Sequence, residues 1–599
     1  MKNILPFRRS VHRSRANVRA ASLRALVAAA MLSLPAAAQP APEAQPAPEH
    51  GPQSEVYAEA IRVEVINVDV YVTDSNGTPV RGLAQEDFQL LINGRPVPIS
   101  NFYAVESPVV AAAQGVRRGA SEPAPEATAT SPAKETPAQA QPPTDQRLHV
   151  VIYIDNFNLT PFKRNKVLVE LRQFLRDFLS PDDLVMLATY DRELNLRQPF
   201  TARPENVTRA LMELESISAQ GIHMQRERLE YIRRIEDSDS VTEALLEADR
   251  WAGSVRNDVS FTIDALRSVV DNLAGSPGRK ALIYVSEGLP MIAGEDMFYV
   301  VQQTWREEMS LNATTEYDMS RRYRELANQA NANRVSFYTI DASGLTTLTQ
   351  GSVDVDIVGA AGTRTFFDNV YRSNMQSTLQ TLAERTGGRA ILNTNRFLPD
   401  LERVAMDFQN YYSLGYINAE GNDGRLHRVE VKLARPQRGW TIRHRDSFRS
   451  KSVETRMHDG TLSALHLDLQ DNPLEARLVF SLPRPRSDGN YDVPLAIRVP
   501  FKNLTLLPAG ENHRASLRLW FAAKDEKDEV SHVQELPVHL EVPAERLEQA
   551  MRGQWEYSID LLMEAGYHDV AIGLLDQLGS QRAFLRRGLT VGEPRPGSR

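Results

Sequence analysis

The sequence predicts an α/β fold in which a central, mostly parallel sheet is flanked by helices and lies between N-terminal and C-terminal β-sandwich-like domains. Three observations predict this arrangement. Uninterrupted apolar runs alternate with helical segments in the middle of the chain, which is typical of parallel strands buried on both faces. Near both ends, apolar and polar residues alternate with the period of a half-buried strand. The length of 599 residues also allows roughly three to four domains.

The central domain is predicted over residues 147–400. Its first strand, residues 149–155, is a continuous apolar run that ends in Asp155. Further strands are predicted at 184–190, 281–285, 335–340 and 389–392, and helices at 163–179, 261–273 and 317–333. Residues 216–258 are rich in charged residues and have a helical composition, so we interpret them as a helical insertion, most simply a solvated hairpin.

The flanking regions have strand periodicity. Residues 55–108 contain alternating valines and two turn signals, which predict a small β-sandwich-like domain. Segments 411–416 and 427–433 predict an antiparallel pair, so residues 401–450 are interpreted as a β-hairpin extension. Short alternating segments predict a C-terminal β-sandwich over 455–599, and the first of them includes Leu465, Leu467 and Leu469.

The N-terminus indicates export. Residues 1–38 combine seven basic residues, a short apolar run and an Ala-rich cleavage site, as in a secretory signal peptide, although an uncleaved amphipathic tail is the alternative. Removing them would change the formal net charge from −8 to −15. The Pro/Ala-rich segments 39–54 and 109–146 are predicted linkers. No later apolar stretch reaches about 18 residues, so we expect no transmembrane segment and a periplasmic or secreted location.

Composition and motifs exclude several function classes. The chain has no cysteine, which removes disulfides, thiolate zinc sites and cysteine nucleophiles. Its acidic balance argues against nucleic-acid binding. It contains no phosphate-binding G-x-x-x-x-G-K-[ST], no H-E-x-x-H and no G-x-S-x-G motif. We therefore expect a chain that is not an enzyme.

Several motifs, in matching order and spacing, resemble those of the von Willebrand factor A-related proteins of bacteria. They are Val70–Asp74, Glu86–Phe88, the strand ending at Asp155, Gly278–Pro290, Tyr338–Asp341, Leu382–Ala390 and Tyr411–Tyr416. This resemblance implies a Rossmann-like von Willebrand factor A domain that is used for adhesion or ligand binding. It covers the region beyond residue 455 less fully.

The resemblance also implies a metal-ion-dependent adhesion site at the C-terminal edge of the sheet, where hard oxygen ligands would hold Mg²⁺ or Ca²⁺. Asp155 matches the first ligand of the family motif, but Phe157 and Leu159 replace its two serines. The remaining candidate ligands are the hydroxyls of Ser260 and Thr262 and the carboxylate of Glu287. Asn156 and Asn158 are possible substitutes for the missing serines. We expect a degenerate site in which Asp155 serves strand-end hydrogen bonding.

Three functions remain open from the sequence. The first is an exported, non-enzymatic module that binds a protein or surface partner. The second is a hydrolase of envelope polymers that uses the carboxylates of Asp155 and Glu287. The third is a structural protein whose central domain is only a scaffold.

Overall fold

The structure is a computed structural model that describes residues 64–106, 147–180, 183–306, 312–345, 361–418, 421, 423–468 and 471–592. The predicted signal peptide and both predicted linkers lie outside these ranges. The described residues belong to one compact unit, Arg62–Arg599. None of the helices in these ranges has the length and apolar character that crossing a membrane requires.

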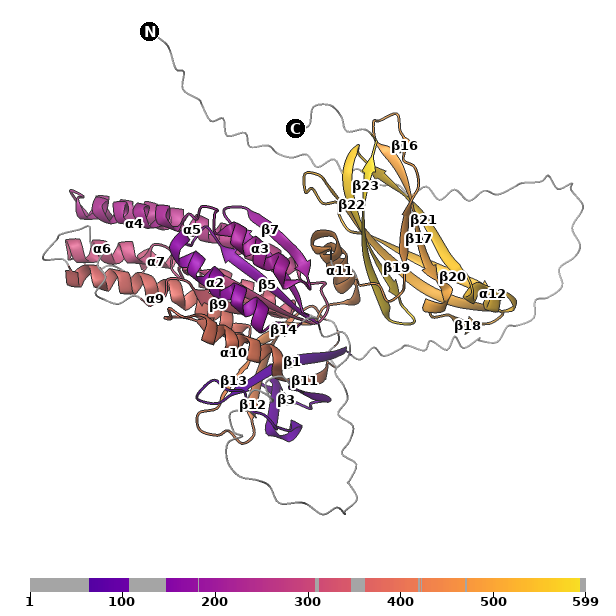
Figure 1. The fold of residues 1–599 in the computed structure, drawn as a ribbon, viewed down its shortest axis with the longest axis horizontal. Helices are drawn as coiled ribbons and strands as arrows, with labels where there is room; N and C mark the ends of the chain where they lie inside the picture. The colour runs from indigo at the N-terminus through magenta and orange to yellow at the C-terminus, as the bar shows by residue number, and fades with distance from the viewer. Residues whose placement is uncertain are drawn as a thin grey trace, which may run out of the picture. The chain divides into compact units, whose positions relative to one another are not determined.

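The predicted parallel-rich sheet flanked by helices is confirmed (Figure 1). Six strands form it in the order β10-β9-β8-β5-β6-β7, and only β7 runs antiparallel to its neighbour. Their bounds are β5 Leu148–Asp155, β6 Leu184–Tyr190, β7 Leu194–Thr201, β8 Arg279–Ser286, β9 Val335–Asp341 and β10 Ala390–Ile391. All eight residues of β5 and of β8 are buried, which explains the apolar runs 150–154 and 281–285 at their centres.

Helices cover both faces of this sheet. One apolar core joins the sheet to α2 (Pro161–Asp177), α3 (Pro204–Leu214) and α10 (Leu398–Gln409). The core on the other face contains side chains of α4 (Gly221–Glu236), α5 (Val241–Asn272), α6 (Glu295–Trp305), α8 (Ser320–Ala332) and α9 (Ala361–Arg385). A four-residue helix, α7, spans Asn312–Thr315. The helix predicted at 261–273 begins twenty residues earlier, because the second helix of the predicted insertion continues into it as α5.

The N-terminal strands pair with strands that follow the central domain. One antiparallel sheet has the order β13-β1-β11-β4 and another the order β14-β12-β2-β3. Their bounds are β1 Glu64–Thr73, β2 Phe88–Ile92, β3 Arg95–Val97, β4 Asn101–Glu106, β11 Asn410–Asn418, β12 Leu426–Leu433, β13 Thr441–His444 and β14 Ser447–Arg449. A 3-10 turn, η1, spans Gln85–Asp87. Both sheets contribute to a single apolar core.

The predicted antiparallel pair of segments 411–416 and 427–433 is wrong. These segments are β11 and β12, and they lie in different sheets: β11 pairs with β1 and β4, whereas β12 pairs with β2 and β14. Alternation shows which side chains face the core but carries no information about the neighbouring strand. Three of the neighbours, β1, β4 and β2, lie more than 300 residues earlier in the chain.

The C-terminal region contains two further antiparallel sheets that share one core. The first contains β15 Arg477–Phe480, β16 Arg484–Pro485, β17 Tyr491–Pro500 and β21 Gln554–Met563. The second contains β18 Leu507–Ala509, β19 Asn512–Asp525, β20 Gln534–Pro543, β22 Gly566–Asp576 and β23 Gln581–Val591. Two 3-10 turns (η2 Phe501–Asn503, η3 Ala544–Arg546) and helix α12 (Leu547–Met551) complete the region.

The strand predicted around Leu465 and Leu467 is wrong, because these residues belong to helix α11 (Val453–Leu467). Its buried residues recur with helical spacing, and the Ser452 side chain accepts a hydrogen bond from Thr455 N at the helix start. Leu469 lies outside the described residues. Helix α11 also contacts the central domain, since Ser463 Oγ donates to Asn272 O at 2.6 Å and accepts from Gly275 N at 2.9 Å.

Candidate functional site at the C-terminal edge of the central sheet

Asp155 ends β5, and its carboxylate accepts hydrogen bonds from three residues. Oδ2 accepts from Tyr284 Oη at 2.5 Å, Asn158 Nδ2 at 2.8 Å and Ser286 Oγ at 3.0 Å, while Oδ1 accepts from Asn158 N at 3.3 Å. The residue has no exposed surface. Burial raises its pKa, and the hydrogen bonds from Tyr284, Asn158 and Ser286 oppose that shift. Asp155 therefore joins the ends of β5 and β8 and stabilises the loop that follows.

The two hydroxyl candidates lie within α5. Ser260 Oγ donates to Arg256 O at 2.8 Å, and Thr262 Oγ1 donates to Asp258 O at 3.0 Å, so each hydroxyl bonds to its own helix. Thr262 is fully buried. Burial raises the pKa of Tyr190, the residue that pairs with Asp155 across β5 and β6, and a hydrogen bond with Thr262 opposes this shift. Thr262 therefore reaches this end of the sheet.

Glu287 follows β8, and its carboxylate is directed to the start of α2. Oε1 accepts from Thr160 N and from Thr160 Oγ1, both at 2.7 Å, and Oε2 forms an ion pair with Lys163 Nζ at 2.7 Å. Thr160 is the residue before the first turn of α2. A carboxylate at a helix N-terminus satisfies free N–H groups and is stabilised by the helix dipole. Glu287 thus attaches α2 to the sheet edge.

The asparagine candidates hold the loop between β5 and α2 in place. Asn156 Oδ1 accepts from the buried Arg164 Nη1 at 2.5 Å, and its Nδ2 donates to Ser218 O at 2.6 Å. Asn158 donates to Asp155, as described above. Phe157 and Leu159, at the positions of the missing serines, are buried in the two cores of the central domain. The loop is therefore anchored by apolar side chains where the family motif supplies oxygen ligands.

These residues do not fit a divalent cation. Such an ion needs several free oxygen ligands, but the carboxylate oxygens of Asp155 and Glu287 accept hydrogen bonds from protein groups. In the described part of the chain, no cluster of three or more His, Asp or Glu side chains could hold a metal ion.

An exposed apolar pair lies beside this loop. Phe162, in the first turn of α2, is 84% exposed, and Ile222, in the first turn of α4, is 41% exposed. The two helix starts are in contact, because Gly221 N donates to Leu159 O at 2.9 Å. A Cβ atom at Gly221 would lie 2.6 Å from Leu159 C, so this approach requires glycine.

The sequence reasoning missed Phe162, although a signal was present. The buried side chains of α2 form one stripe with helical spacing, and Phe162 does not belong to it. An apolar residue outside the buried stripe of a helix, directly after the loop at a strand end, could have been identified from the sequence.

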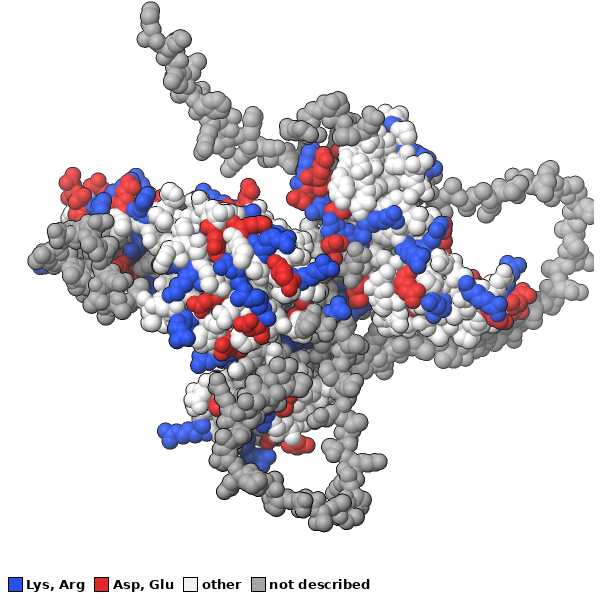
Figure 2. Space-filling model, viewed as in Figure 1, with Lys and Arg blue, Asp and Glu red and all other residues white. Residues whose placement is uncertain are grey.

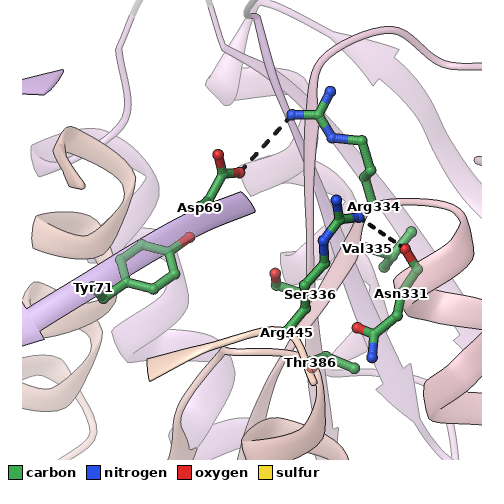
Figure 3. Close-up of a pocket in the computed structure, with 8 residues that line it drawn as sticks. All are labelled: Asp69, Tyr71, Asn331, Arg334, Val335, Ser336, Thr386 and Arg445. Carbon is green, nitrogen blue, oxygen red and sulfur yellow. Dashed lines mark hydrogen bonds and ion pairs between the residues drawn. The ribbon is translucent and has the colours of Figure 1, made fainter. Parts of the chain in front are cut away.

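A small cavity lies at the start of β9, at the opposite end of the sheet (Figure 3). Arg445 lines the cavity and donates a hydrogen bond from Nη1 to Asn331 O at 3.1 Å. Asp69 and Arg334 also line it, with an ion pair between Asp69 Oδ2 and Arg334 Nη2 at 4.0 Å. The cavity has a volume of about 20 Å³, which matches a single water molecule rather than an organic ligand. The edge that carries Asp155 therefore remains the candidate functional site.

No family model matches the chain, and no curated protein matches it. Solved structures with some similarity include an aerotolerance-related membrane protein from Bacteroides fragilis (11% identity, 44% of this chain and 98% of that chain, TM-score 0.23). BatB from Bacteroides thetaiotaomicron has 11% identity, covers 44% and 96%, and has a TM-score of 0.22. A von Willebrand factor type A protein from Catenulispora acidiphila has 10% identity, covers 76% and 67%, and has a TM-score of 0.20. Scores this low carry no argument about function.

Proposed function

We propose that this chain is an exported von Willebrand factor A-related protein that binds a protein partner at the C-terminal edge of its central sheet, without a metal ion. The observation that carries the proposal is the exposure of Phe162 at that edge. Aromatic side chains are common anchors of protein interfaces, and open α/β sheets bind ligands beyond the carboxyl ends of their strands.

The hydrogen bonds of the edge support binding without a cation. In the family, a metal ion would offer an open position to a carboxylate of the partner. Here Asp155 is fully buried and bonded to Tyr284 and Ser286, which supports a binding mode that does not use the Asp155 carboxylate. The same burial argues against a hydrolase in which Asp155 meets a polymer, because a catalytic carboxylate must come within hydrogen-bond reach of its substrate.

A capture experiment tests the proposal. The chain lacking residues 1–38 is immobilised and incubated with periplasmic and secreted fractions of its source organism, and bound proteins are quantified by mass spectrometry. The variants are Phe162→Ala and the matched control Leu482→Ala, which removes an 87% exposed apolar side chain from the C-terminal region. We expect Phe162→Ala to lose at least nine-tenths of the captured partner and Leu482→Ala to retain it.

Chelation separates this proposal from a metal-dependent one. Capture should be the same with EDTA as with added Mg²⁺ or Ca²⁺. Loss of capture in EDTA would contradict the metal-free part of the proposal, and equal capture by Phe162→Ala and the unchanged chain would contradict the location of the binding edge.

A further inference from the structure

Helix α5 has an outward strip that is separate from its buried side. The buried side chains, which include Trp251, Val259 and Ile263, belong to the apolar core beneath the helix. The outward residues are spaced by three or four positions, so they lie on one face of the helix. All are exposed except one half-buried glycine. We call them the α5 strip: Arg250, Gly253, Asn257, Phe261 and Asp264.

The α5 strip contains one large apolar side chain and one hollow. Phe261 is 63% exposed. A Cβ atom at Gly253 would meet no described atom within 4 Å, so the helix backbone is uncovered there. An aromatic ring can pack closely on a glycine, because no side chain holds the two helices apart. Phe261 and Gly253 are eight residues apart, about 12 Å along the axis, so the ring fits this hollow only on another helix.

The α5 strip is arranged in complementary pairs about Asn257. Gly253 and Phe261 lie four residues on either side of it, and Arg250 and Asp264 lie seven residues on either side. When two copies of one helix pack antiparallel about a twofold axis, a residue before the axis meets the residue equally far after it in the other copy. With Asn257 on the axis, Phe261 of each copy meets Gly253 of the other, and Arg250 meets Asp264.

The charged residues of the α5 strip have room for these contacts. Arg250 forms an ion pair with Glu247, and its side chain remains 57% exposed. Asp264 Oδ1 accepts from Arg322 Nη2 at 2.6 Å, and the Asp264 side chain remains 56% exposed. The register that places Phe261 over the hollow therefore also brings opposite charges together, and complementary charges fix the register of an interface.

We propose that this chain forms a symmetric homodimer through the α5 strip, with the two α5 helices antiparallel and Asn257 at the twofold axis. Self-complementarity favours a second copy over an unrelated partner, because the aromatic ring and the hollow that fits it lie on one helix. Acidic and basic side chains are interspersed over the described part of the central domain that faces the viewer in Figure 2, so no patch of one sign opposes association there. One helix pair is a small interface, so we expect a reversible, concentration-dependent dimer.

Analytical ultracentrifugation of the chain lacking residues 1–38, over a range of concentrations, tests the proposal. Phe261→Ala removes the ring and Gly253→Leu fills the hollow, and each should raise the dissociation constant of the dimer at least tenfold. Leucine at position 253 enters open space in the monomer and favours the helix, so circular dichroism melts should show no loss of stability. The control Leu482→Ala, at an 87% exposed position in the C-terminal region, should leave the dimer unchanged.

Exchanging charges tests the register. Arg250→Glu and Asp264→Arg should each weaken the dimer, because each places like charges opposite one another at two symmetric positions. The double variant Arg250→Glu/Asp264→Arg restores opposite charges and should dimerise more tightly than either single variant. Salt should weaken the unchanged dimer.

The absence of cysteine allows a direct test of the axis. Asn257→Cys introduces the only thiol of the chain, and mild oxidation should link two copies, because residues on a twofold axis come within disulfide reach. Lys527→Cys, at an exposed position in the C-terminal region, should give little linked dimer on a non-reducing gel.

Three results would overturn the proposal: a monomer at every concentration, a dimer that Phe261→Ala and Gly253→Leu leave unchanged, or a double charge variant that dimerises no better than the single ones. If Phe261→Ala loses a captured protein while the unchanged chain sediments as a monomer, the α5 strip binds a different protein and the homodimer is wrong. None of these results bears on the proposed function, which depends on Phe162 in α2.

Discussion

Arg279 at the start of β8 donates a hydrogen bond from Nη2 to the hydroxyl of Tyr71 in β1, at 2.8 Å, across 208 positions of sequence. The same guanidinium donates to Phe408 O at 3.0 Å and lies 3.7 Å from the centre of the Tyr411 ring. Asp69 completes the group with an ion pair at 3.3 Å. These contacts join the N-terminal strands to the central sheet.

We predict that Arg279→Met destabilises the protein by about 3 kcal/mol, because it leaves the Tyr71 hydroxyl, the Phe408 carbonyl and Asp69 without a buried partner. Chemical denaturation followed by circular dichroism measures the change. The matched control is Arg484→Met, which breaks an ion pair with Asp560 in which both side chains are about 60% exposed, and this change should not be measurable. Equal stability of the two variants would contradict the structural role of Arg279.

Asp155 should matter for stability rather than for cation binding. Asp155→Ala removes the acceptor for Tyr284 and Ser286, two buried hydroxyls, and we expect a loss of about 3 kcal/mol. Asp155→Asn keeps one acceptor oxygen and avoids a buried charge, so its loss should be nearer to about 1 kcal/mol. Thermal and denaturant unfolding give both values. An Asp155→Ala variant with unchanged stability but lost partner binding would instead assign Asp155 to the binding site.

Acid should destabilise the protein through its buried histidines. Burial, followed by the charge of Lys280, lowers the pKa of His149 to about 4 from its ordinary value of 6.5, and burial also lowers the pKa of His444. The folded state therefore favours the neutral rings. Their stabilisation is complete above pH 6.5 and is lost as the pH falls toward 4, with His149 alone accounting for about 3 kcal/mol.

Comparing variants isolates this effect, because Asp155, with its raised pKa, contributes with the opposite sign. Denaturation curves between pH 7 and 4 should show a shallower loss for His149→Gln than for the unchanged chain. A His539→Gln variant, at an exposed position on β20, should follow the unchanged chain. Parallel curves for His149→Gln and the unchanged chain would contradict the prediction.

Five of the six strands of the central sheet could be predicted from the sequence, because each is marked locally by an apolar run, whereas β7 could not, because it mixes polar and apolar residues and none of them is buried. The pairing partners of β11 and β12 could not be predicted. β11 pairs with β1 and β12 pairs with β2, and both partners lie more than 300 residues earlier in the chain. At the candidate site, Asp155 was identified by its place at a strand end. Its partner Tyr284 was not, because an apolar strand gives no sign that one tyrosine will donate a hydrogen bond across it.

Two helical glycines should respond to alanine with opposite signs. Gly253 lies within α5, and a Cβ atom there would meet nothing within 4 Å, so Gly253→Ala should stabilise the protein by about 0.5–1 kcal/mol through helix propensity. Gly460 lies within α11, where a Cβ atom would stand 2.2 Å from Phe584 Cζ, and Gly275 approaches the same backbone.

Because the Phe584 ring is held in the core beneath α11, Gly460→Ala must displace either the helix or the ring, and we expect a loss of about 1–3 kcal/mol despite the better propensity of alanine. Urea denaturation measures the change in the free energy of unfolding for both variants, which we expect to be a gain for Gly253→Ala and a loss for Gly460→Ala. The displacement should also weaken the contact of Ser463 with Asn272 and Gly275, so amide hydrogen exchange at Gly275 should be faster in Gly460→Ala and unchanged in Gly253→Ala. Stabilisation by both substitutions would contradict the close packing of α11 against β23 and the loop after α5.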